Sequence, residues 1–181
     1  PPSMTDPSRE DLIYDWNEDA LLPKRPIQFD DETLRDGLQC PSVQDPDLDQ
    51  KIRLVHLMDD LGIDTADVGL PGASARAREH IATLVRETKD LNITTNVACR
   101  TMISDIEPVV DLVQEVGEPV EVCAFIGSSP IRQYAENWEM DKMVQLSREA
   151  IEFCVKHDLP CMFVTEDTTH ARPGDVRALY T

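Results

Sequence analysis

From Pro26 to its last residue the chain alternates between short strand-like runs and longer helix-like segments, and this alternation is the strongest constraint on its fold. We expect strands at residues 27–29, 65–70, 93–98, 120–126 and 161–165. Apolar residues at helical spacing fill the intervals, over about residues 48–61, 74–91, 104–116 and 137–157, and Pro173 begins a further helix. Strands that alternate with helices predict an α/β fold with a parallel sheet.

Segment length favours one kind of parallel sheet. A (β/α)8 TIM barrel has about 31 residues per unit at its typical ~250 residues, so residues 27–181 hold about five units. We therefore expect a partial TIM-barrel domain, made of the first five βα units of a longer barrel. A doubly wound five-stranded sheet fits the same count and stays open as the alternative.

Residues 1–26 differ in composition from the rest of the chain. Five prolines interrupt them, and residues 9–22 have the pattern of a short acidic helix. We expect an N-terminal acidic arm here, outside the partial barrel of residues 27–181.

The charge balance excludes some classes of partner. The chain has 35 acidic and 17 basic residues and a formal net charge of -18, which argues against binding to nucleic acid or to an anionic membrane. No apolar run is long enough for a membrane span, and none resembles a signal peptide, so we expect a cytoplasmic protein. The five cysteines form no CxxC pair, and their odd number does not suggest a disulfide framework.

Polar side chains gather at or just beyond the end of each expected strand, which is where parallel α/β folds bind their ligands. They are Arg35, Asp36, Gln39, Asp67, Asn96, Arg100, Ser128, Ser129, Arg132, Glu166, Asp167, Thr168, Thr169 and His170. Asp67 lies on an otherwise apolar strand, and a buried carboxylate needs a partner or a metal. Asp36 is a candidate ligand for a hard divalent cation, with a solvated loop pair of Arg35 and Asp36 as the alternative. No HxH, HExxH or Cys/His cluster occurs, so the chain is not expected to contain a complete metal site.

The stretch Asp31-Glu32-Thr33-Leu34-Arg35-Asp36-Gly37-Leu38-Gln39 resembles the first-strand signature of a known enzyme family. That family includes 2-isopropylmalate synthase, homocitrate synthase, citramalate synthase and 3-hydroxy-3-methylglutaryl-CoA lyase. Four further segments match in order, at residues 66–71, 98–100, 125–131 and 166–169, so the resemblance covers residues 27 to 181. It implies a metal-dependent TIM barrel that makes or breaks a carbon–carbon bond next to an acyl-CoA thioester.

The resemblance also implies roles for individual residues. In the family, the aspartate matching Asp36 binds a divalent metal (Mg, Mn or Zn), and histidines on a later strand, outside this chain, complete the metal site. The arginine matching Arg35 stabilises an enolate oxygen, which a fixed guanidinium can do. Glu166 is expected to contribute to acyl-CoA binding or to proton transfer. His170 is a further catalytic candidate because it is the one histidine in a site loop.

Four residues are expected to bind substrate, and three positions depart from the family pattern. The expected substrate-binding residues are Gln39, Asp67, Arg100 and Ser129. Leu38 stands where the synthases often have glutamate or asparagine, and the lyases also use leucine there. Asp67 replaces the usual glutamate, and Arg132 stands where many synthases have histidine.

Three functions follow from this resemblance. We expect part of an acyltransferase that condenses acetyl-CoA with a 2-oxo acid, as in amino-acid biosynthesis, and that works as a homodimer. The first alternative is an acyl-CoA lyase or aldolase, which runs the reaction in the other direction. The second is a non-catalytic partial barrel that serves as a binding or assembly module. The identity of the 2-oxo acid, the reaction direction and the metal stay open at this point.

Overall fold

A computed structural model describes residues 26–181, and these residues form one parallel five-stranded sheet. The strands are β1 (Asp30–Asp31), β2 (Thr65–Asp67), β3 (Thr94–Arg100), β4 (Glu121–Gly127) and β5 (Cys161–Glu166). Each strand pairs in parallel with its neighbour in sequence, so the order across the sheet is β1-β2-β3-β4-β5. The predicted acidic arm, apart from Pro26, lies outside the described residues.

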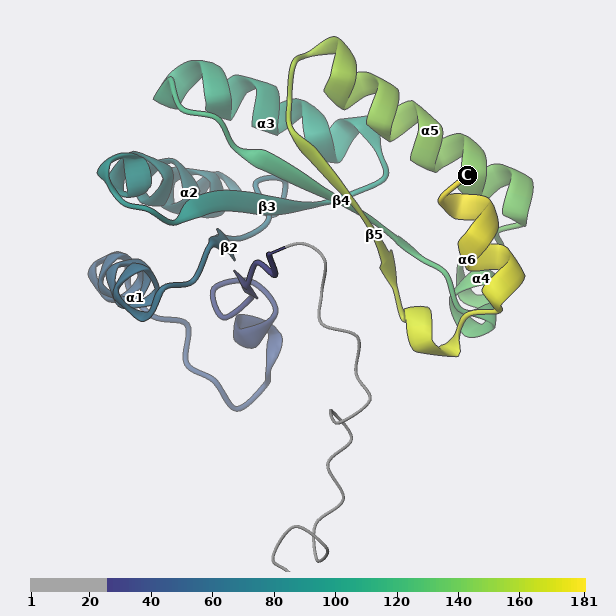
Figure 1. Ribbon diagram of the computed structural model, residues 1–181, viewed down its shortest axis with the longest axis horizontal. Coiled ribbons are helices and arrows are strands. Elements are labelled where there is room, and N and C mark those ends of the chain that lie inside the picture. The colour runs from purple at the N-terminus through teal and green to yellow at the C-terminus, as the bar shows by residue number, and fades with distance from the viewer. Residues whose placement is uncertain (1–25) are drawn as a thin grey trace, which may run out of the picture.

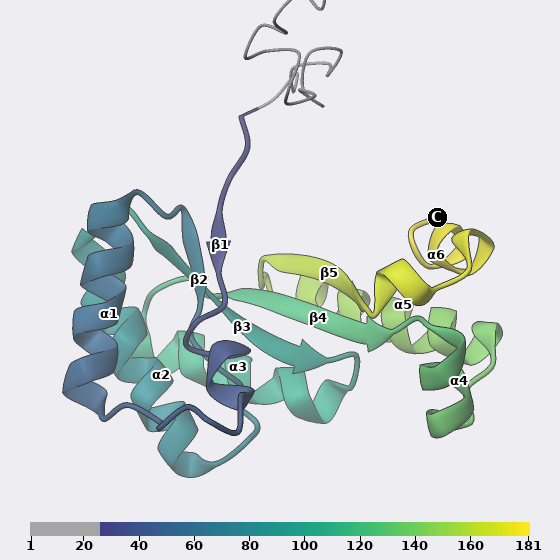
Figure 2. The same ribbon diagram turned by 90° about the horizontal axis from the view of Figure 1, so that it is seen from below.

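The helices follow the outer side of this sheet. They are α1 (Leu48–Leu61), α2 (Ala75–Glu87), α3 (Ile103–Val116), α4 (Pro130–Glu136), α5 (Met140–Lys156) and α6 (Pro173–Leu179). Figure 1 shows α1, α2, α3 and α5 succeeding one another around the curled sheet, and neighbours along this arc are in contact. In Figure 2 the sheet is seen from the side opposite to α3 and α5.

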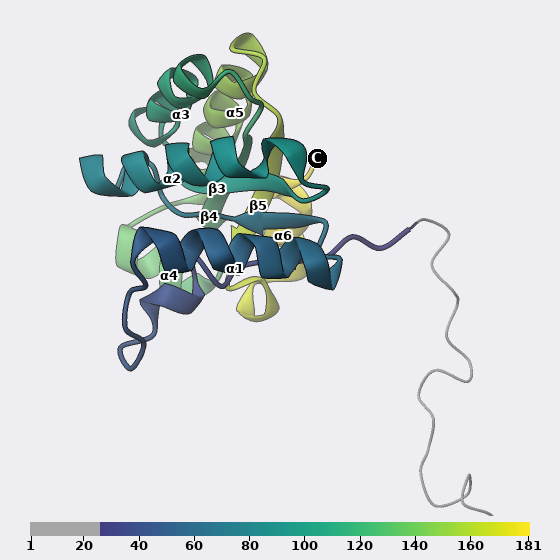
Figure 3. The same ribbon diagram turned by 90° about the vertical axis from the view of Figure 1, so that its left-hand side faces the viewer.

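Strand order decides between the two predicted architectures. A doubly wound sheet reverses its strand order at a switch point, whereas the order here is strictly sequential. The helices α1, α2 and α3 also lie beside one another on the same side of the sheet (Figure 3). The chain is therefore a half-barrel of the (β/α)8 type, and the prediction of about five βα units is confirmed.

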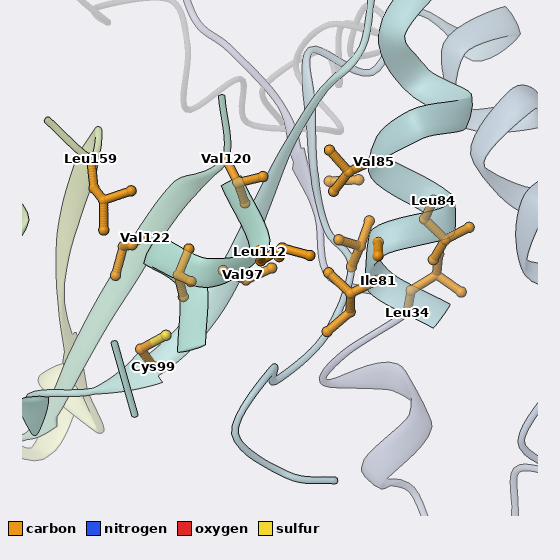
Figure 4. Packing of buried hydrophobic residues seen from close by; sticks show 14 of the residues in the cluster. Leu34, Ile81, Leu84, Val85, Val97, Cys99, Leu112, Val120, Val122 and Leu159 are labelled. Carbon is orange, nitrogen blue, oxygen red and sulfur yellow. The ribbon is translucent and has the colours of Figure 1, made fainter. Parts of the chain in front are cut away.

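The core lies between the sheet and the helices. On β3 and β4 alternate side chains point outward, so Val97, Cys99, Val122 and Ala124 join one buried cluster with residues of α1, α2, α3 and α5. Figure 4 shows Leu112 of α3 among these strand residues. β3 and β4 contribute only their alternate residues to this core, and this leaves their other residues for the inner face.

The inner face of the sheet is polar near its centre. Asn96 is fully buried, and its side-chain amide donates to Asp30 Oδ1 at 2.8 Å and to Thr65 Oγ1 at 3.1 Å. Cys123 Sγ donates to Asn96 Oδ1 at 3.4 Å. These bonds join β1, β2, β3 and β4 across the inside of the half-barrel, because a buried amide must find partners there.

Helix ends agree with the sequence in part. α1 begins at Leu48, as expected, with Asp47 as its N-cap, and Asp47 exchanges hydrogen bonds with Gln50 in a capping box. α3 begins at Ile103, one residue before its expected start, and the Met102 carbonyl accepts a hydrogen bond from Asp105 N. Gly62 ends α1 at φ 84°, a conformation that favours glycine.

Two elements differ from the prediction. The first strand was expected at residues 27–29, but β1 is Asp30–Asp31, and the side chains of Ile27 and Phe29 are exposed. Pairing begins at the Phe29 carbonyl, which accepts from Asp64 N and Thr65 N at 3.1 Å. Residues 130–136, for which no element was expected, form α4, with Ser129 as its N-cap. In the described part of the chain, no helix combines the length and apolar character needed to cross a membrane.

Candidate active site

Arg35 is the centre of a charged cluster at the carboxyl ends of β1 and β2. Its guanidinium lies 2.5 Å from Glu32 Oε2, 3.3 Å from Asp36 Oδ1 and 3.3 Å from Asp67 Oδ2. Gly37 N and Arg35 N both donate to the Glu32 carbonyl, so the chain turns tightly here and leaves strand geometry. This turn brings the adjacent residues Arg35 and Asp36 to the same site.

Asp67 of β2 holds the Arg35 guanidinium in place. Its side chain is fully buried, with Oδ2 toward Arg35 Nε and Oδ1 accepting from Gly69 N at 3.0 Å. Burial raises the pKa of the Asp67 carboxyl from its ordinary 3.8 to about 7, an increase that the Gly69 amide and the Arg35 charge offset only in part. The sequence assigned Asp67 to substrate binding, but its contacts are to Arg35 and to the backbone. Its contact with substrate stays a prediction.

We predict that Asp67→Asn changes how stability depends on pH. In the unfolded chain the Asp67 carboxyl loses its proton near pH 3.8, whereas in the folded chain it keeps the proton up to about pH 7. Between these values only the folded state holds this proton, so the free energy of unfolding falls as the pH rises through the interval. Urea unfolding over this range should show a steeper fall for the wild type than for Asp67→Asn. The other acidic residues contribute equally to the pH dependence of both proteins. Parallel curves of unfolding free energy against pH would therefore contradict the raised pKa of Asp67.

Asp36 is the only predicted metal ligand, and it is open to solvent. Its side chain is 66% exposed. The two nearest carboxylates of the cluster, Glu32 and Asp67, are occupied by Arg35. Among residues 26–181, no group of three or more His, Cys, Asp or Glu side chains is placed to hold a metal ion. Among the described residues, Asp36 therefore stays a single candidate ligand.

A second group of predicted residues lies around the ends of β3, β4 and β5. Arg100 and Glu166 line one cavity of about 370 Å³. Arg100 is held by two bonds to Asp105, at 2.6 and 2.9 Å. Glu166 is 45% exposed and lies 3.6 Å from Arg132 Nη2. The structure therefore brings a predicted substrate residue and a predicted catalytic residue to one cavity.

The other three predicted residues do not line this cavity. Gln39 is exposed and lines a cavity of about 440 Å³ together with Arg35. Ser129 is fully buried, and its hydroxyl accepts from Arg132 N as the cap of α4. His170 is 77% exposed, and its Nδ1 lies 2.6 Å from Asp167 Oδ1, whose hydrogen bond and charge raise the pKa of the imidazole. The catalytic role of His170 and the substrate role of Ser129 stay predictions.

Comparison with known proteins identifies the family. The model of the HMGL-like family matches residues 26–181. The chain belongs to the HMGL-like family. This confirms the resemblance that the strand-end segments carry, and it accounts for their spacing along the half-barrel.

Named relatives of this HMGL-like chain are synthases. It is 30% identical over 148 residues to 2-isopropylmalate synthase of Nitratidesulfovibrio vulgaris, covering 81% of this chain and 28% of that one. It is 28% identical over 174 residues to homocitrate synthase AksA of Methanocaldococcus jannaschii, covering 92% of this chain and 41% of that one. A probable 2-isopropylmalate synthase of Methanosarcina mazei is 30% identical over 160 residues, which cover 88% of this chain and 29% of that one. The chain thus spans between about a quarter and two fifths of the length of these relatives.

Several side chains of the HMGL-like site were not predicted. Glu32 forms an ion pair with Arg35. Its position three residues before Arg35 could have indicated this pairing. Asp105 is the partner of Arg100 and was not among the predicted site residues. Trp138 and Lys142 line the cavity with Arg100 and Glu166, although 36 or more residues separate them from Arg100 in sequence. No local pattern indicates such a pairing.

Proposed function

We propose that this chain is the N-terminal part of an enzyme that condenses acetyl-CoA with a 2-oxo acid. One observation carries the proposal: a guanidinium, Arg35, is held by three carboxylates at the carboxyl end of β1, in a chain whose named relatives are synthases of this type. Condensation at the methyl group of acetyl-CoA passes through an enolate, and a fixed cation stabilises the charge that develops on the enolate oxygen.

The surroundings of Arg35 suit this role. Glu32 and Asp67 restrain the guanidinium from two directions, so it need not reorganise when charge develops. Its side chain is still 21% exposed, which leaves part of it accessible to a ligand. Gln39, on the same cavity, is proposed to contact the bound acid.

Glu166 is proposed to act on the acyl-CoA side. Its carboxylate is 45% exposed at the end of β5 and lies 3.6 Å from Arg132 Nη2. An ionised carboxylate at this place can accept the proton that leaves the methyl carbon of acetyl-CoA. His170, in the next turn, is proposed to assist proton transfer from the same loop.

We propose that the complete enzyme also binds a divalent metal. When bound, it would supply Lewis-acid polarisation of the 2-oxo acid carbonyl, with Asp36 as one ligand and histidines outside this chain as others. Asp36 is the one metal ligand that we propose among the described residues.

A lyase is the second candidate, and Leu38 is the observation that favours it. Leucine at this position matches the lyase form of the motif, and Leu38 lines the same cavity as Arg35 and Gln39. Arg35 would then stabilise the enolate that leaves when the carbon–carbon bond breaks. A non-catalytic binding module is the remaining alternative.

We propose a cytoplasmic homodimer as the working form. β1 and β5 are the outer strands of the described sheet, and free strand edges readily pair with other chains.

The test is an assay of free CoA release from acetyl-CoA with a panel of 2-oxo acids. It uses the full-length product of the reading frame that contains these 181 residues. We expect release with at least one acid and in the presence of a divalent metal. Absence of release with every acid, together with cleavage of a hydroxyacyl-CoA, would show a lyase instead. Absence of both reactions would favour the binding module.

A further inference from the structure

Two cysteine side chains meet where helix α5 leads into strand β5. Cys154 lies in the last turn of α5, and Cys161 is the first residue of β5. Cys154 is fully buried in the hydrophobic core between the sheet and the helices, and Cys161 is partly buried and packs against the same core. The two thiols therefore share one environment on the outer side of the sheet.

The short connection between the two cysteines folds back on itself. Six residues separate Cys154 from Cys161. The Cys154 carbonyl accepts hydrogen bonds from His157 N at 3.1 Å and from Leu159 N at 2.9 Å, so the chain turns at once where α5 ends. Asp158, within this turn, has the left-handed conformation with φ 53°. This reversal returns Cys161 toward the helix that carries Cys154.

A hydrogen bond joins the two thiols. It raises the pKa of Cys154 and lowers the pKa of Cys161, so Cys154 is the donor and the Cys161 sulfur is the acceptor. Burial raises the pKa of Cys154 further. Cys161 is thus the thiol that more readily becomes a thiolate, which is the nucleophilic form, and it is also the more exposed of the two.

The other three cysteines have different surroundings. Cys40 is exposed on the turn after β1, and its Sγ lies 3.1 Å from Ser42 Oγ. Cys123 is on the inner face of the sheet, bonded to Asn96. Cys99 is buried in the same core as Cys154, and burial raises the pKa of its thiol to about 12. Because Cys99 shares this core with the pair, it is the competing thiol that a test must exclude.

We propose that Cys154 and Cys161 are a redox-active pair that a hydroperoxide converts into a disulfide. The Cys161 thiolate attacks one oxygen of hydrogen peroxide, the O–O bond breaks, and Cys161 becomes a sulfenic acid as hydroxide leaves. The Cys154 sulfur then attacks the Cys161 sulfur. The S–S bond forms, the S–O bond breaks, and the Cys154 proton leaves with the hydroxyl group as water. The two sulfurs lose two electrons, and the peroxide gains them.

This pair is separate from the candidate active site. Cys161 begins β5, whereas Glu166 ends it, so the two residues lie at opposite ends of the strand. Oxidation should therefore tie α5 to β5 without occupying the cavity that Glu166 lines. The inference does not depend on the proposed condensation.

Mass spectrometry of the oxidised 181-residue chain tests the proposal. The Cys40→Ser variant serves as the parent, because its exposed thiol would otherwise react with peroxide as well, and it retains four of the five cysteines. The reduced protein is treated with hydrogen peroxide, alkylated with iodoacetamide and digested. We expect a peptide that links Cys154 to Cys161, and a fall from four to two in the thiols titrated after denaturation. Dithiothreitol should restore all four, since a disulfide is reducible.

The matched variants each remove one buried thiol from this parent. In Cys154→Ala the disulfide should be lost, and Cys161 should stop at the sulfenic acid, which dimedone labels. Cys99→Ala should still form the disulfide between Cys154 and Cys161. Circular dichroism of each variant confirms that it is folded, and the linked peptide of the parent protein needs no further variant.

Three results would overturn the proposal. The first is that all four thiols survive a peroxide concentration that oxidises free cysteine. The second is a linked peptide that joins Cys161 to Cys99 in place of Cys154. The third is a loss of thiols that dithiothreitol does not reverse, because this would show oxidation to sulfinic or sulfonic acid without a disulfide.

Discussion

Arg35→Ala should lower the rate of acetyl-CoA condensation by about 10²–10³-fold, the loss seen when one preorganised donor to a developing oxyanion is removed. The guanidinium is held by Glu32, Asp36 and Asp67, so it is positioned before charge develops. Free CoA release by the full-length reading-frame product, in the presence of a 2-oxo acid, measures the effect. Arg35→Lys keeps the charge but not the planar fork, and it should restore only a small part of the activity.

The fold should survive the loss of Arg35. Asp67 is then left without its cationic partner, but its carboxyl already has a pKa raised to about 7 by burial, so it can remain protonated. Arg53→Ala, an exposed arginine on α1, is the matched control and should leave CoA release unchanged. Full activity of Arg35→Ala would remove Arg35 from the proposed mechanism.

Leu112→Ala should destabilise the half-barrel by about 2–5 kcal/mol, the range measured for large-to-small changes in well-packed cores. Leu112 is completely buried on α3, in the cluster that joins this helix to β3 and β4 (Figure 4). The truncation loses apolar burial and leaves a cavity that the surrounding helices cannot fill. Urea unfolding, with the slope compared between variants, gives the change in free energy.

The control for this prediction is an exposed leucine. Leu61 ends α1 and is 78% exposed, so Leu61→Ala should change the free energy of unfolding by no more than about 0.5 kcal/mol. Similar losses for the two variants would mean that the cluster around Leu112 is not the core of the folded chain.

The sequence was sufficient for the fold because its local signals agree. Strand-like runs alternate with helix-like segments, and glycines such as Gly62 and Gly117 end helices where the left-handed conformation is needed. The boundaries were less predictable. The apolar residues Ile27 and Phe29 suggested a strand, but pairing with β2 begins only at the end of that run, and β1 is Asp30–Asp31.

The sequence also placed the site at the strand ends, but it could not pair the side chains. That Arg35 meets Asp67 depends on the register of β1 against β2, which no local pattern specifies. Substrate binding by Ser129 stays a prediction, and its role as the buried N-cap of α4 is one that the sequence did not indicate. Arg132 was expected at the strand ends and as a departure from the family pattern, but no sequence pattern indicates how closely its side chain approaches Gly127.

The most direct test of the central claim is a map of where acetyl-CoA binds. Amide resonances of the isotope-labelled 181-residue chain are followed by NMR during titration with acetyl-CoA. If the carboxyl ends of the strands form the site, the shifts should cluster at Arg35–Gln39, Arg100, Gly127–Arg132 and Glu166–His170. Shifts confined to the opposite end of the sheet, or no shifts at saturating acetyl-CoA, would contradict the assignment of this edge as the active site.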